Sequence, residues 1–485
     1  MYQPLSDTSA AGGGNDPAVA TAVIGSGGAG LAAAWALARS GRPVVLMERG
    51  PRAGGHIDTR DAGPALGLDL PVPVDTGFIV YNERNYPNLV RLFDAIGTET
   101  TASEMSFAVS LGNGAYEYRG SPAGLFAAPR NLIDPGHWRM LRDMHRFNRQ
   151  ARIQPPPPGQ SLGTFLAAHG YSADFARRYL LPMGAAIWSA PMATMLDFPA
   201  ESFIRFFHNH ALLDYRGRPV WRTVAGGTGS YAARILAHPL ISFAGDAGVE
   251  VVLRDAAGPL VKCRDHAPRR FAAVVLAAHA DDSLALLDQP TTAETSVLGA
   301  FGYQANRAVL HRDTRLMPRR RRAWAAWNYL GRSIAGAGAG AGHEHLAVSY
   351  WMNRLQPLAT DRNLFVTLNP PVEPASAIAD IAYAHPVFDA AAIAAQHRLG
   401  ALQGQGGVFY AGSYFGFGFH EDACASGLAA GVMAGADLPW ADLLGEQTRR
   451  RLPALDGLAP RLTRRVAAMA RPSHSPAADL AAAAE

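Results

Sequence analysis

The sequence contains few cysteines, few lysines and no long hydrophobic run. Its two cysteines, Cys263 and Cys424, cannot build a disulfide framework, and neither lies in a Cys/His array with the spacing of a zinc site. We therefore expect no metal centre and a reducing, cytoplasmic location. No stretch is apolar over the roughly 18 residues that a membrane span needs. Residues 1–17 lack the basic flank and apolar core of a secretory signal.

The cations are almost entirely arginine, because Lys262 is the only lysine among 44 basic residues. Against 40 acidic residues the formal net charge is only +4, and this mild excess does not indicate a nucleic-acid partner. The strongest local cluster is the run Arg319–Arg322. A solvated face is one interpretation of this run, and peripheral contact with anionic headgroups at the inner face of a membrane is the other.

The overall composition is that of a globular protein. With 485 residues, 48% of them hydrophobic and 17% charged, the chain is long enough for two or three domains. Residues 1–17 form a polar leader, and residues 441–485 are rich in arginine, alanine and proline. We expect the leader and most of this tail to be disordered and the part between them to fold.

A dinucleotide-binding pattern stands near the start of the chain. A predicted buried strand over residues 18–24 runs into Gly25-x-Gly27-x-x-Gly30, and an Ala/Leu-rich helix and a second strand follow. In such a unit the glycines allow a tight turn and close backbone approach to a pyrophosphate at the helix N-terminus. Glu48 ends the second strand, 18 residues beyond Gly30, where an acid accepts hydrogen bonds from an adenosine ribose. A glycine-rich turn without a ligand is the alternative.

The residues that follow Glu48 favour FAD over NAD. The stretch ERGPRAGGH supplies Arg49, Arg52, Gly54, Gly55 and His56. An arginine with close-packed glycines can follow the phosphates and ribityl chain of the longer cofactor, and an NAD enzyme needs no such extension. For Arg52, a solvated loop position is the alternative.

Eight segments between residues 20 and 440 together resemble one protein family. They are VIGSGGAGLAAAW (23–35), ERGPRAGGH (48–56), VDTGFIVYNERNYPNL (74–89), LLPMGAAIWSAP (180–191), FFHNHALL (206–213), RPVWRTVAGGTGSY (218–231), PRRRRAWAAWNY (318–329) and YAGSYFGFGFHEDACASGLAAG (410–431). With them the sequence resembles the FAD-dependent amine oxidase and phytoene desaturase superfamily, in particular a bacterial subgroup of amine-oxidase-like NAD/FAD-binding proteins.

This resemblance implies an α/β fold with two interleaved domains. An FAD-binding, Rossmann-like domain of the GR2 type would comprise residues 18–80, 215–290 and 400–440. An α+β substrate domain would comprise residues 81–214 and 291–399. Residues 239–265 depart from the pattern, because they lack a clear strand pair to dock the adenine; Val249 or Val251 are the candidates for that contact.

The resemblance also implies a set of residues that hold one noncovalent FAD. Cys424 does not match the position of the cysteine that tethers flavin in some similar oxidases, so a covalent link is not expected. The predicted cofactor-binding residues are Gly25, Gly27, Gly28, Ala29, Gly30, Glu48, Arg49, Arg52, Gly54, Gly55, His56, Thr76, Gly77, Phe78, Gly412, Gly418, Phe419, His420 and Glu421.

Lysine content bears on the reaction. Amine oxidases of the similar superfamily commonly place a lysine near flavin N5, but Lys262 lies in a polar stretch that we predict to be a surface turn.

Similar proteins often accompany enzymes that modify lipids. Aromatic residues of the predicted substrate domain, which would line an apolar pocket or simply pack in the core, are Trp188, Phe203, Phe206, Phe207, Trp221, Trp324, Trp327, Tyr350 and Trp351.

We therefore predict an FAD-dependent oxidoreductase of lipid metabolism that removes a hydride from an apolar substrate, desaturating a fatty acyl or other lipid chain. The alternatives are a flavin amine oxidase, a flavin-binding accessory protein without turnover and a redox-neutral isomerase. His420, Glu421 and Tyr81 are the candidate catalytic residues, with helix capping as the structural alternative. His208 and His210 lie about 200° apart around a helix, which favours core or lining positions over a metal pair.

Overall fold

A computed structural model describes residues 20–441 except 158, 215–216 and 334–343, together with residue 444. The predicted disordered leader, 1–17, and nearly all of the predicted disordered tail, 441–485, lie outside the described residues. No helix in the described part of the chain is both long and apolar enough to cross a membrane.

A five-stranded parallel sheet forms the centre of one half of the molecule. Its order is β10-β2-β1-β14-β20. β1 lies between β2, the next strand of the chain, and the sequence-distant β14, with Thr21 opposite Val44 and Ala273. Such a sheet is buried on both faces, which explains the continuous apolar strands. The strands are β1 (Thr21–Ile24), β2 (Val44–Met47), β10 (Ile241–Ala244), β14 (Ala273–Leu276) and β20 (Val408–Tyr410). The Rossmann-like part of the predicted fold is confirmed.

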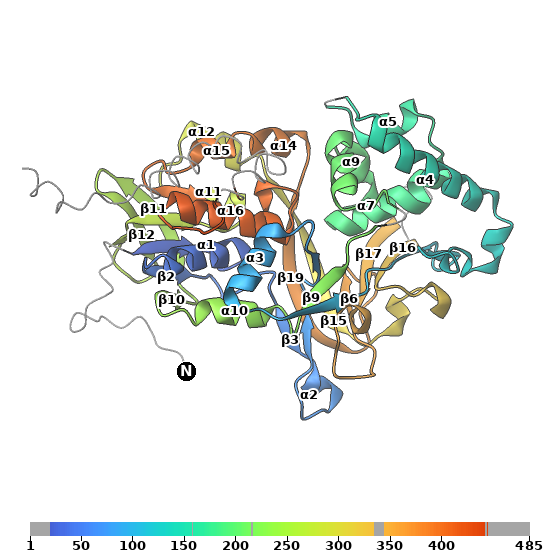
Figure 1. The fold of residues 1–485 in the computed structure, drawn as a ribbon, viewed down its shortest axis with the longest axis horizontal. Helices are drawn as coiled ribbons and strands as arrows, with labels where there is room; N and C mark the ends of the chain where they lie inside the picture. Colours follow the sequence, from blue (N-terminus) through green and yellow to red (C-terminus); the bar gives the residue numbers. More distant parts are fainter. Residues whose placement is uncertain (1–19, 158, 215–216, 334–343, 442–443, 445–485) are drawn as a thin grey trace, which may run out of the picture.

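Two helices from opposite ends of the chain pack together over this sheet. Helix α1 (Gly28–Arg39) follows the glycine-rich loop, and α16 (His420–Met433) follows β20. Figure 1 shows them side by side, one blue and one red. A Cβ at Gly427 would lie 2.1 Å from the Ala29 carbonyl oxygen, so glycine lets the two backbones approach closely. This contact places the start of α16 next to the dinucleotide loop.

The segment that was expected to lack a strand pair forms one. Strands β11 (Val249–Asp255) and β12 (Gly258–Cys263) make an antiparallel hairpin, which β13 (Arg269–Arg270) extends. Charges obscured this pattern in the sequence, because one face of the hairpin is exposed and its ions pair across strands, as Lys262 does with Glu250 at 3.4 Å. Lys262 therefore lies within a strand rather than in the predicted turn.

A seven-stranded sheet belongs to the other half of the molecule. Its order is β19-β15-β18-β17-β16-β7-β8. The long strands β15 and β19 pair over most of their length. The strands are β7 (Phe107–Leu111), β8 (Tyr116–Arg119), β15 (Gly302–His311), β16 (Trp327–Ser333), β17 (Glu344–Trp351), β18 (Phe365–Leu368) and β19 (Ala377–Val387).

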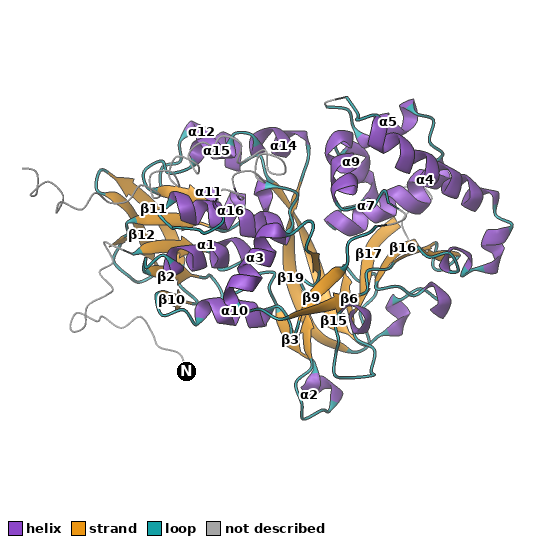
Figure 2. Cartoon of the chain, in the orientation of Figure 1, coloured by secondary structure: helices purple, strands orange, loops and turns teal. Residues whose placement is uncertain are grey.

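A group of helices covers the far side of that sheet. Figure 2 shows them gathered at one end of the molecule, above β16 and β17. They are α4 (Pro135–Ile153), α5 (Leu162–Ala168), α7 (Leu181–Trp188), α8 (Met192–Asp197) and α9 (Ala200–Asn209). Asp134 caps α4 by accepting a hydrogen bond from the Gly136 amide at 2.8 Å.

Small sheets and helices join the halves. A three-stranded sheet of β5 (Tyr81–Asn82), β9 (Trp221–Val224) and β6 (Thr100–Ser103) crosses between them, and α3 (Pro87–Ile96) and α10 (Gly229–Leu236) flank it. The hydrophobic core has two main parts, one around the parallel sheet and one under the helical group, with Trp221 packed against both. The predicted domain boundaries within the chain stay a prediction.

Candidate active site

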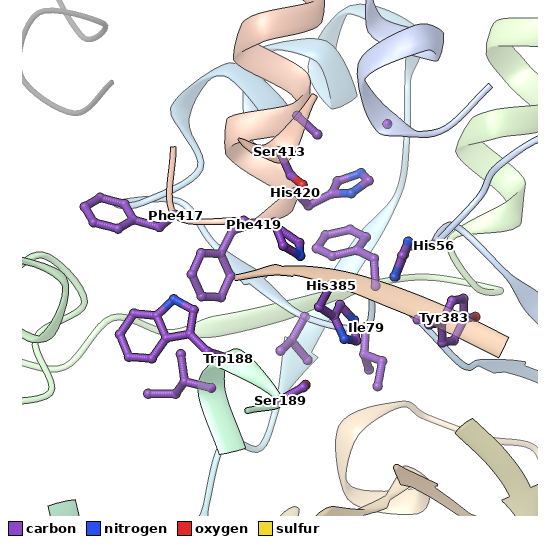
Figure 3. A pocket seen from close by; sticks show the side chains of 18 of the residues that line it. His56, Ile79, Trp188, Ser189, Tyr383, His385, Ser413, Phe417, Phe419 and His420 are labelled. Carbon is purple, nitrogen blue, oxygen red and sulfur yellow. The ribbon is translucent and has the colours of Figure 1, made fainter. Parts of the chain in front are cut away.

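One cavity of about 1310 Å³ runs from the glycine-rich loop to the helical group. Its nucleotide end is lined by the loop after β1 and the end of β2, its middle by β19 and the start of α16, and its far end by α4, α7 and α9. Figure 3 shows Trp188, Phe417 and Phe419 on one side of the pocket and His56 and Tyr383 on the other. The two halves of the fold therefore share a single site.

The glycine-rich loop leaves room for a pyrophosphate. Gly25 has a φ of +97°, and a Cβ at Gly30 would lie 1.8 Å from the Gly25 carbonyl oxygen, so these two glycines shape the turn itself. A Cβ at Gly27, by contrast, would meet no atom within 4 Å. Gly27 thus borders open space at the N-terminus of α1, where unpaired amides and the helix dipole favour an anion.

Glu48 closes the turn and lines the cavity at the end of β2. Its carboxylate accepts hydrogen bonds from the Ser26 amide at 2.9 Å and the Ser26 hydroxyl at 2.6 Å. The Gly50 amide also donates to it, at 3.1 Å. Glu48 therefore holds the loop against the second strand, and a contact with ribose stays a proposal.

The hairpin supplies the outermost part of the nucleotide end. Gly248, Val249, Glu250 and Arg264 line the cavity there, whereas Val251 does not. Val249, one of the two candidates for docking the adenine, is thus brought to the site. Gly248, Glu250 and Arg264 were missed because the hairpin itself was not foreseen.

His420 occupies the centre of the site at the first turn of α16. Its ring stacks on Phe78, with centroids 3.9 Å apart and planes inclined by 11°, and its Nε2 is hydrogen-bonded to the Tyr231 hydroxyl. Burial lowers the pKa of His420 to about 3 and raises the pKa of Tyr231, so a neutral phenol and a neutral imidazole share this hydrogen bond. Cε1 and Nδ1 of the ring lie 2.7 and 3.1 Å from the position of a Gly28 Cβ. His420 thus turns an uncharged ring toward the N-terminus of α1.

The other two candidate catalytic residues lie outside the cavity lining. The Glu421 carboxylate accepts hydrogen bonds from the Asn88 and Leu89 amides, each at 3.0 Å, at the first turn of α3. Burial raises the pKa of Glu421 to about 7. Tyr81 is buried in β5 and packs edge-on against Phe93 at 5.4 Å. For Glu421 this geometry favours the helix-capping alternative.

Most of the predicted cofactor residues line the cavity. Arg52 instead pairs with Asp58 at 3.1 Å with its side chain half exposed, as its alternative interpretation held. Gly30, Gly54 and Glu421 do not line the cavity either. The fifteen that line it are Gly25, Gly27, Gly28, Ala29, Glu48, Arg49, Gly55, His56, Thr76, Gly77, Phe78, Gly412, Gly418, Phe419 and His420.

A wall of neutral imidazoles and a phenol was only partly foreseen. His56 stacks on Tyr383 with ring centroids 4.4 Å apart and lies 5.1 Å from His385. Burial, together with the neighbouring histidines, holds the pKa of His56 well below its usual value, and burial lowers the pKa of His385 to about 4. Tyr383 and His385 alternate on β19, so their spacing of two within a strand was the available signal.

The polar groups at this wall fit a bound flavin. Nε2 of His56 is buried and has no hydrogen-bond partner among the described residues, and a buried polar atom without a partner costs free energy unless a ligand or water satisfies it. Together with the open space beside Gly27, this atom indicates that the lining is complementary to a long, polar cofactor with an anionic centre.

The far end of the cavity is apolar. Phe206 stacks on Phe419 at 5.0 Å and contacts Trp188 at 4.8 Å. Of the nine predicted aromatics, five line the cavity and four, Phe203, Phe207, Trp324 and Trp351, do not. The apolar residues of this end are Met140, Met144, Tyr179, Met183, Ile187, Trp188, Phe206, Trp221, Trp327, Tyr350, Phe417 and Phe419.

Neither the single lysine nor the buried cysteine of α16 reaches the cavity surface. Lys262 is half exposed and paired with Glu250. Cys424 is buried, and burial raises the pKa of its thiol. His208 is exposed on α9, whereas His210 lines the cavity and stacks on Phe206 at 3.8 Å, so these two histidines do not form a metal pair.

A parallel sheet with an anion-binding loop, joined through one cavity to an apolar chamber, defines a two-domain nucleotide-cofactor oxidoreductase. The model of the family "flavin containing amine oxidoreductase" matches residues 29–317, which is more than half of the chain. The protein therefore belongs to this family, as the resemblance predicted, and FAD is the cofactor that the family membership assigns to the cavity.

Individual relatives are more distant. The (S)-6-hydroxynicotine oxidase of Paenarthrobacter nicotinovorans is 29% identical over 134 residues, and this match spans 27% of the chain but only 30% of that curated relative. Cyclohexylamine oxidase from Brevibacterium oxydans IH-35A superposes with a TM-score of 0.62 at 15% identity, over 86% of this chain and 99% of the other. The CLA-producing fatty acid isomerase from P. acnes superposes with a TM-score of 0.59 at 16% identity, over 86% and 98%. These structural likenesses confirm the predicted fold class.

Proposed function

We propose that the protein dehydrogenates a long apolar substrate, a fatty acyl or another lipid chain, and leaves a carbon–carbon double bond. The observation that carries the proposal is the far end of the cavity, where methionines and aromatic rings continue from Phe419 to α4 without a carboxylate. Apolar walls of this kind bind hydrocarbon by burying its surface, at about 25 cal/mol per Å². An ammonium group would find no anionic partner there.

The chain's own residues hold the substrate and exclude water. Phe206 stacks on Phe419 and packs against the tilted ring of Trp188, and this cluster guides a chain that enters from the far end. Bound FAD supplies a two-electron acceptor for the hydride that leaves one carbon. The second hydrogen leaves the adjacent carbon as a proton, for which the unprotonated imidazoles of His56 and His385 on the cavity wall offer acceptors. The neutral wall of His56, Tyr383 and His385 adds hydrogen-bonding groups without adding charge beside the apolar chamber.

Within this proposal His420 serves the cofactor. Its ring faces the α1 N-terminus, and the hydrogen bond between Nε2 and the Tyr231 hydroxyl fixes the orientation of the ring. We propose that the whole FAD is held noncovalently, with Glu48 binding the ribose and Val249 contacting the adenine. Glu421 and Tyr81 then support the site from behind, the first by capping α3 and the second by packing in the core.

An amine oxidase is the second candidate. It is favoured by the names of two relatives, an oxidase of hydroxynicotine and an oxidase of cyclohexylamine. Against it stands Lys262, the only lysine of the chain, which lies on β12 outside the cavity lining. The fatty acid isomerase among the structural neighbours supports an acyl substrate and also keeps a redox-neutral reaction as an alternative.

The test is anaerobic mixing of the FAD-loaded protein with candidate substrates while the flavin absorbance is followed. Phospholipid vesicles of varied acyl composition and free fatty acids form one set, and primary amines and polyamines form the other. Bleaching by an acyl substrate, with a new double bond in the product, is the expected result. Bleaching by amines alone contradicts the proposal, and conversion of an acyl chain without bleaching indicates an isomerase.

A further inference from the structure

We propose that an apolar surface beside the cavity mouth docks the protein on an anionic lipid bilayer. This surface, called here the docking segment, consists of residues 121–133 and Trp138. The proposal rests on the proposed function in one respect, because an acyl chain carried on a lipid would have to enter from a bilayer. The geometry and charges of the segment are independent of the reaction.

The docking segment exposes an unusual number of large apolar side chains. Leu132, Ile133 and Trp138 are 54%, 84% and 50% exposed, and Arg130 is the only charged residue between positions 121 and 133. Scattered apolar side chains are common on protein surfaces, but clustered ones mark interaction sites. A membrane-spanning helix is not required for such binding. A few apolar residues inserted at the bilayer interface suffice when cations bind the headgroups beside them.

Internal contacts fix the shape of this surface. The Trp138 indole N–H donates a hydrogen bond to the Leu132 carbonyl oxygen at 3.0 Å, and Phe126 packs against the Trp138 ring with centroids 5.6 Å apart. The side-chain amide of Asn131 donates to the Leu125 carbonyl oxygen at 3.0 Å. The apolar residues are therefore presented on a preformed support, so that little conformational entropy is lost on docking.

The same segment forms part of the cavity wall. Leu125 and Pro122 line the cavity, and Pro122 is also exposed, so the cavity reaches the surface here. The first turns of α4 continue this double role, since Met140 and Met144 line the cavity while Trp138 faces out. A bilayer resting on the docking segment would thus lie against the apolar end of the site, the end to which an acyl chain belongs.

Unpaired cations lie within the segment and on a neighbouring loop. The buried Glu117 connects the two regions: its carbonyl oxygen accepts from Asn131 at 3.0 Å, and its carboxylate accepts from the amides of Arg319 and Arg320. Arg320 also forms an ion pair with this carboxylate. Arg130, Arg319 and Arg322 are exposed and have no carboxylate within ion-pair distance among the described residues.

This charge pattern favours a bilayer over a second copy of the chain. Two copies meeting through this surface would bring these like charges together, whereas anionic headgroups would neutralise them. Arg321 is a further exposed cation of the same run, and its guanidinium stacks on Trp324 at 3.7 Å and on Trp351 at 4.5 Å. Apolar insertion and headgroup contact would therefore act side by side.

The test is cosedimentation of the full chain, FAD-loaded, with vesicles of pure phosphatidylcholine and with vesicles containing phosphatidylglycerol. We expect binding to the anionic vesicles that weakens as salt is raised. The double variant L132S/I133S should bind at least tenfold more weakly. Leu70→Ser is the matched control, since Leu70 is 73% exposed in the turn after α2 (Gly63–Leu66), outside the docking segment, and should change nothing. Flavin content and melting temperature verify that each variant folds.

A second pair of variants separates the charges from the apolar contact. Arg319→Gln with Arg322→Gln should weaken binding to anionic vesicles and leave the residual binding to neutral vesicles unchanged. Equal vesicle binding by wild type and L132S/I133S would overturn the proposal. So would a concentration-dependent dimer that L132S/I133S abolishes without an effect on vesicles, which would assign the surface to a second copy. Because no turnover is measured, a wrong substrate class leaves this result unaffected.

Discussion

The two ends of the cavity are built in different ways. At the nucleotide end, a short stretch after β1 supplies backbone, and glycines are required where a side chain would block the turn or fill the space for a pyrophosphate. At the apolar end, side chains from α4, α7, α9 and the residues before α16 converge over large sequence distances. The first end depends on local conformation and the second on tertiary packing, so their variants should fail in different ways.

The largest expected effect is at Gly27. Gly27→Val should yield a folded protein without flavin, because a Cβ there meets no protein atom within 4 Å and the side chain occupies the space beside the α1 N-terminus. Gly30→Val should instead impair folding, since a Cβ there lies 1.8 Å from the Gly25 carbonyl oxygen. Flavin absorbance per protein and the melting temperature measure the two effects.

Gly302→Val is a control for these glycine variants. Gly302 also has open space around a Cβ position but lies at the start of β15, away from the loop. It should keep both flavin and stability. Full flavin content in Gly27→Val would show that the pyrophosphate does not bind at this turn, and the comparison between the two ends would lose its first half.

The second effect concerns the apolar end alone. Met183→Arg on α7 should leave the flavin bound and lower the rate of its reduction by an apolar substrate about a hundredfold, because a guanidinium in a dry chamber is costly to bury and blocks the chain. Leu196→Arg on α8 is the control, since Leu196 is 38% exposed and does not line the cavity. Loss of flavin in Met183→Arg would mean that the two ends are not separable.

A smaller effect is expected at the histidine wall between the ends. The folded pKa of His385 is lowered from 6.5 to about 4, so the unfolded chain binds more protons between these values. Its contribution to stability is therefore present above pH 6.5 and lost as the pH falls toward 4, by up to about 1.4 kcal/mol per pH unit. In His385→Gln the free energy of unfolding should therefore fall less steeply as the pH is lowered, by up to that slope. Urea unfolding from pH 4 to 7 measures it.

The difference between variant and wild type is the informative quantity in this experiment. Asp75 and Glu421 have folded pKa values raised to about 6 and about 7, so their contributions fall as the pH rises and oppose those of the histidines. His208→Gln serves as the control, because His208 is exposed on α9. An unchanged slope in His385→Gln would indicate that His385 is protonated in the folded protein.

The contrast between the ends also explains what the sequence could predict. Gly25, Gly27 and Glu48 were identifiable because their spacing follows from local backbone geometry. The spacing of Tyr383 and His385 indicates one face of a strand, but nothing in the sequence indicates that this face of β19 lines the cavity. The β11–β12 hairpin was missed for a third reason, since its alternation is masked by charges that pair with partners elsewhere, such as Arg254 with Glu294 at 2.6 Å.

The smallest expected effect is at Lys262, and it tests whether the apolar end works without a lysine. Lys262 lies on β12 and pairs with Glu250 on β11 at the exposed face of the hairpin. A half-exposed ion pair of this kind contributes at most about 1 kcal/mol to stability. Lys262→Met should therefore change flavin reduction by less than twofold. Arg270→Met is the control, since Arg270 on β13 forms a partly exposed ion pair with Asp255 and does not line the cavity. Anaerobic stopped-flow absorbance provides the measurement. A hundredfold drop specific to Lys262→Met would bring the lysine into the reaction, which its position outside the cavity lining opposes, and would favour amine oxidation over dehydrogenation of an acyl chain.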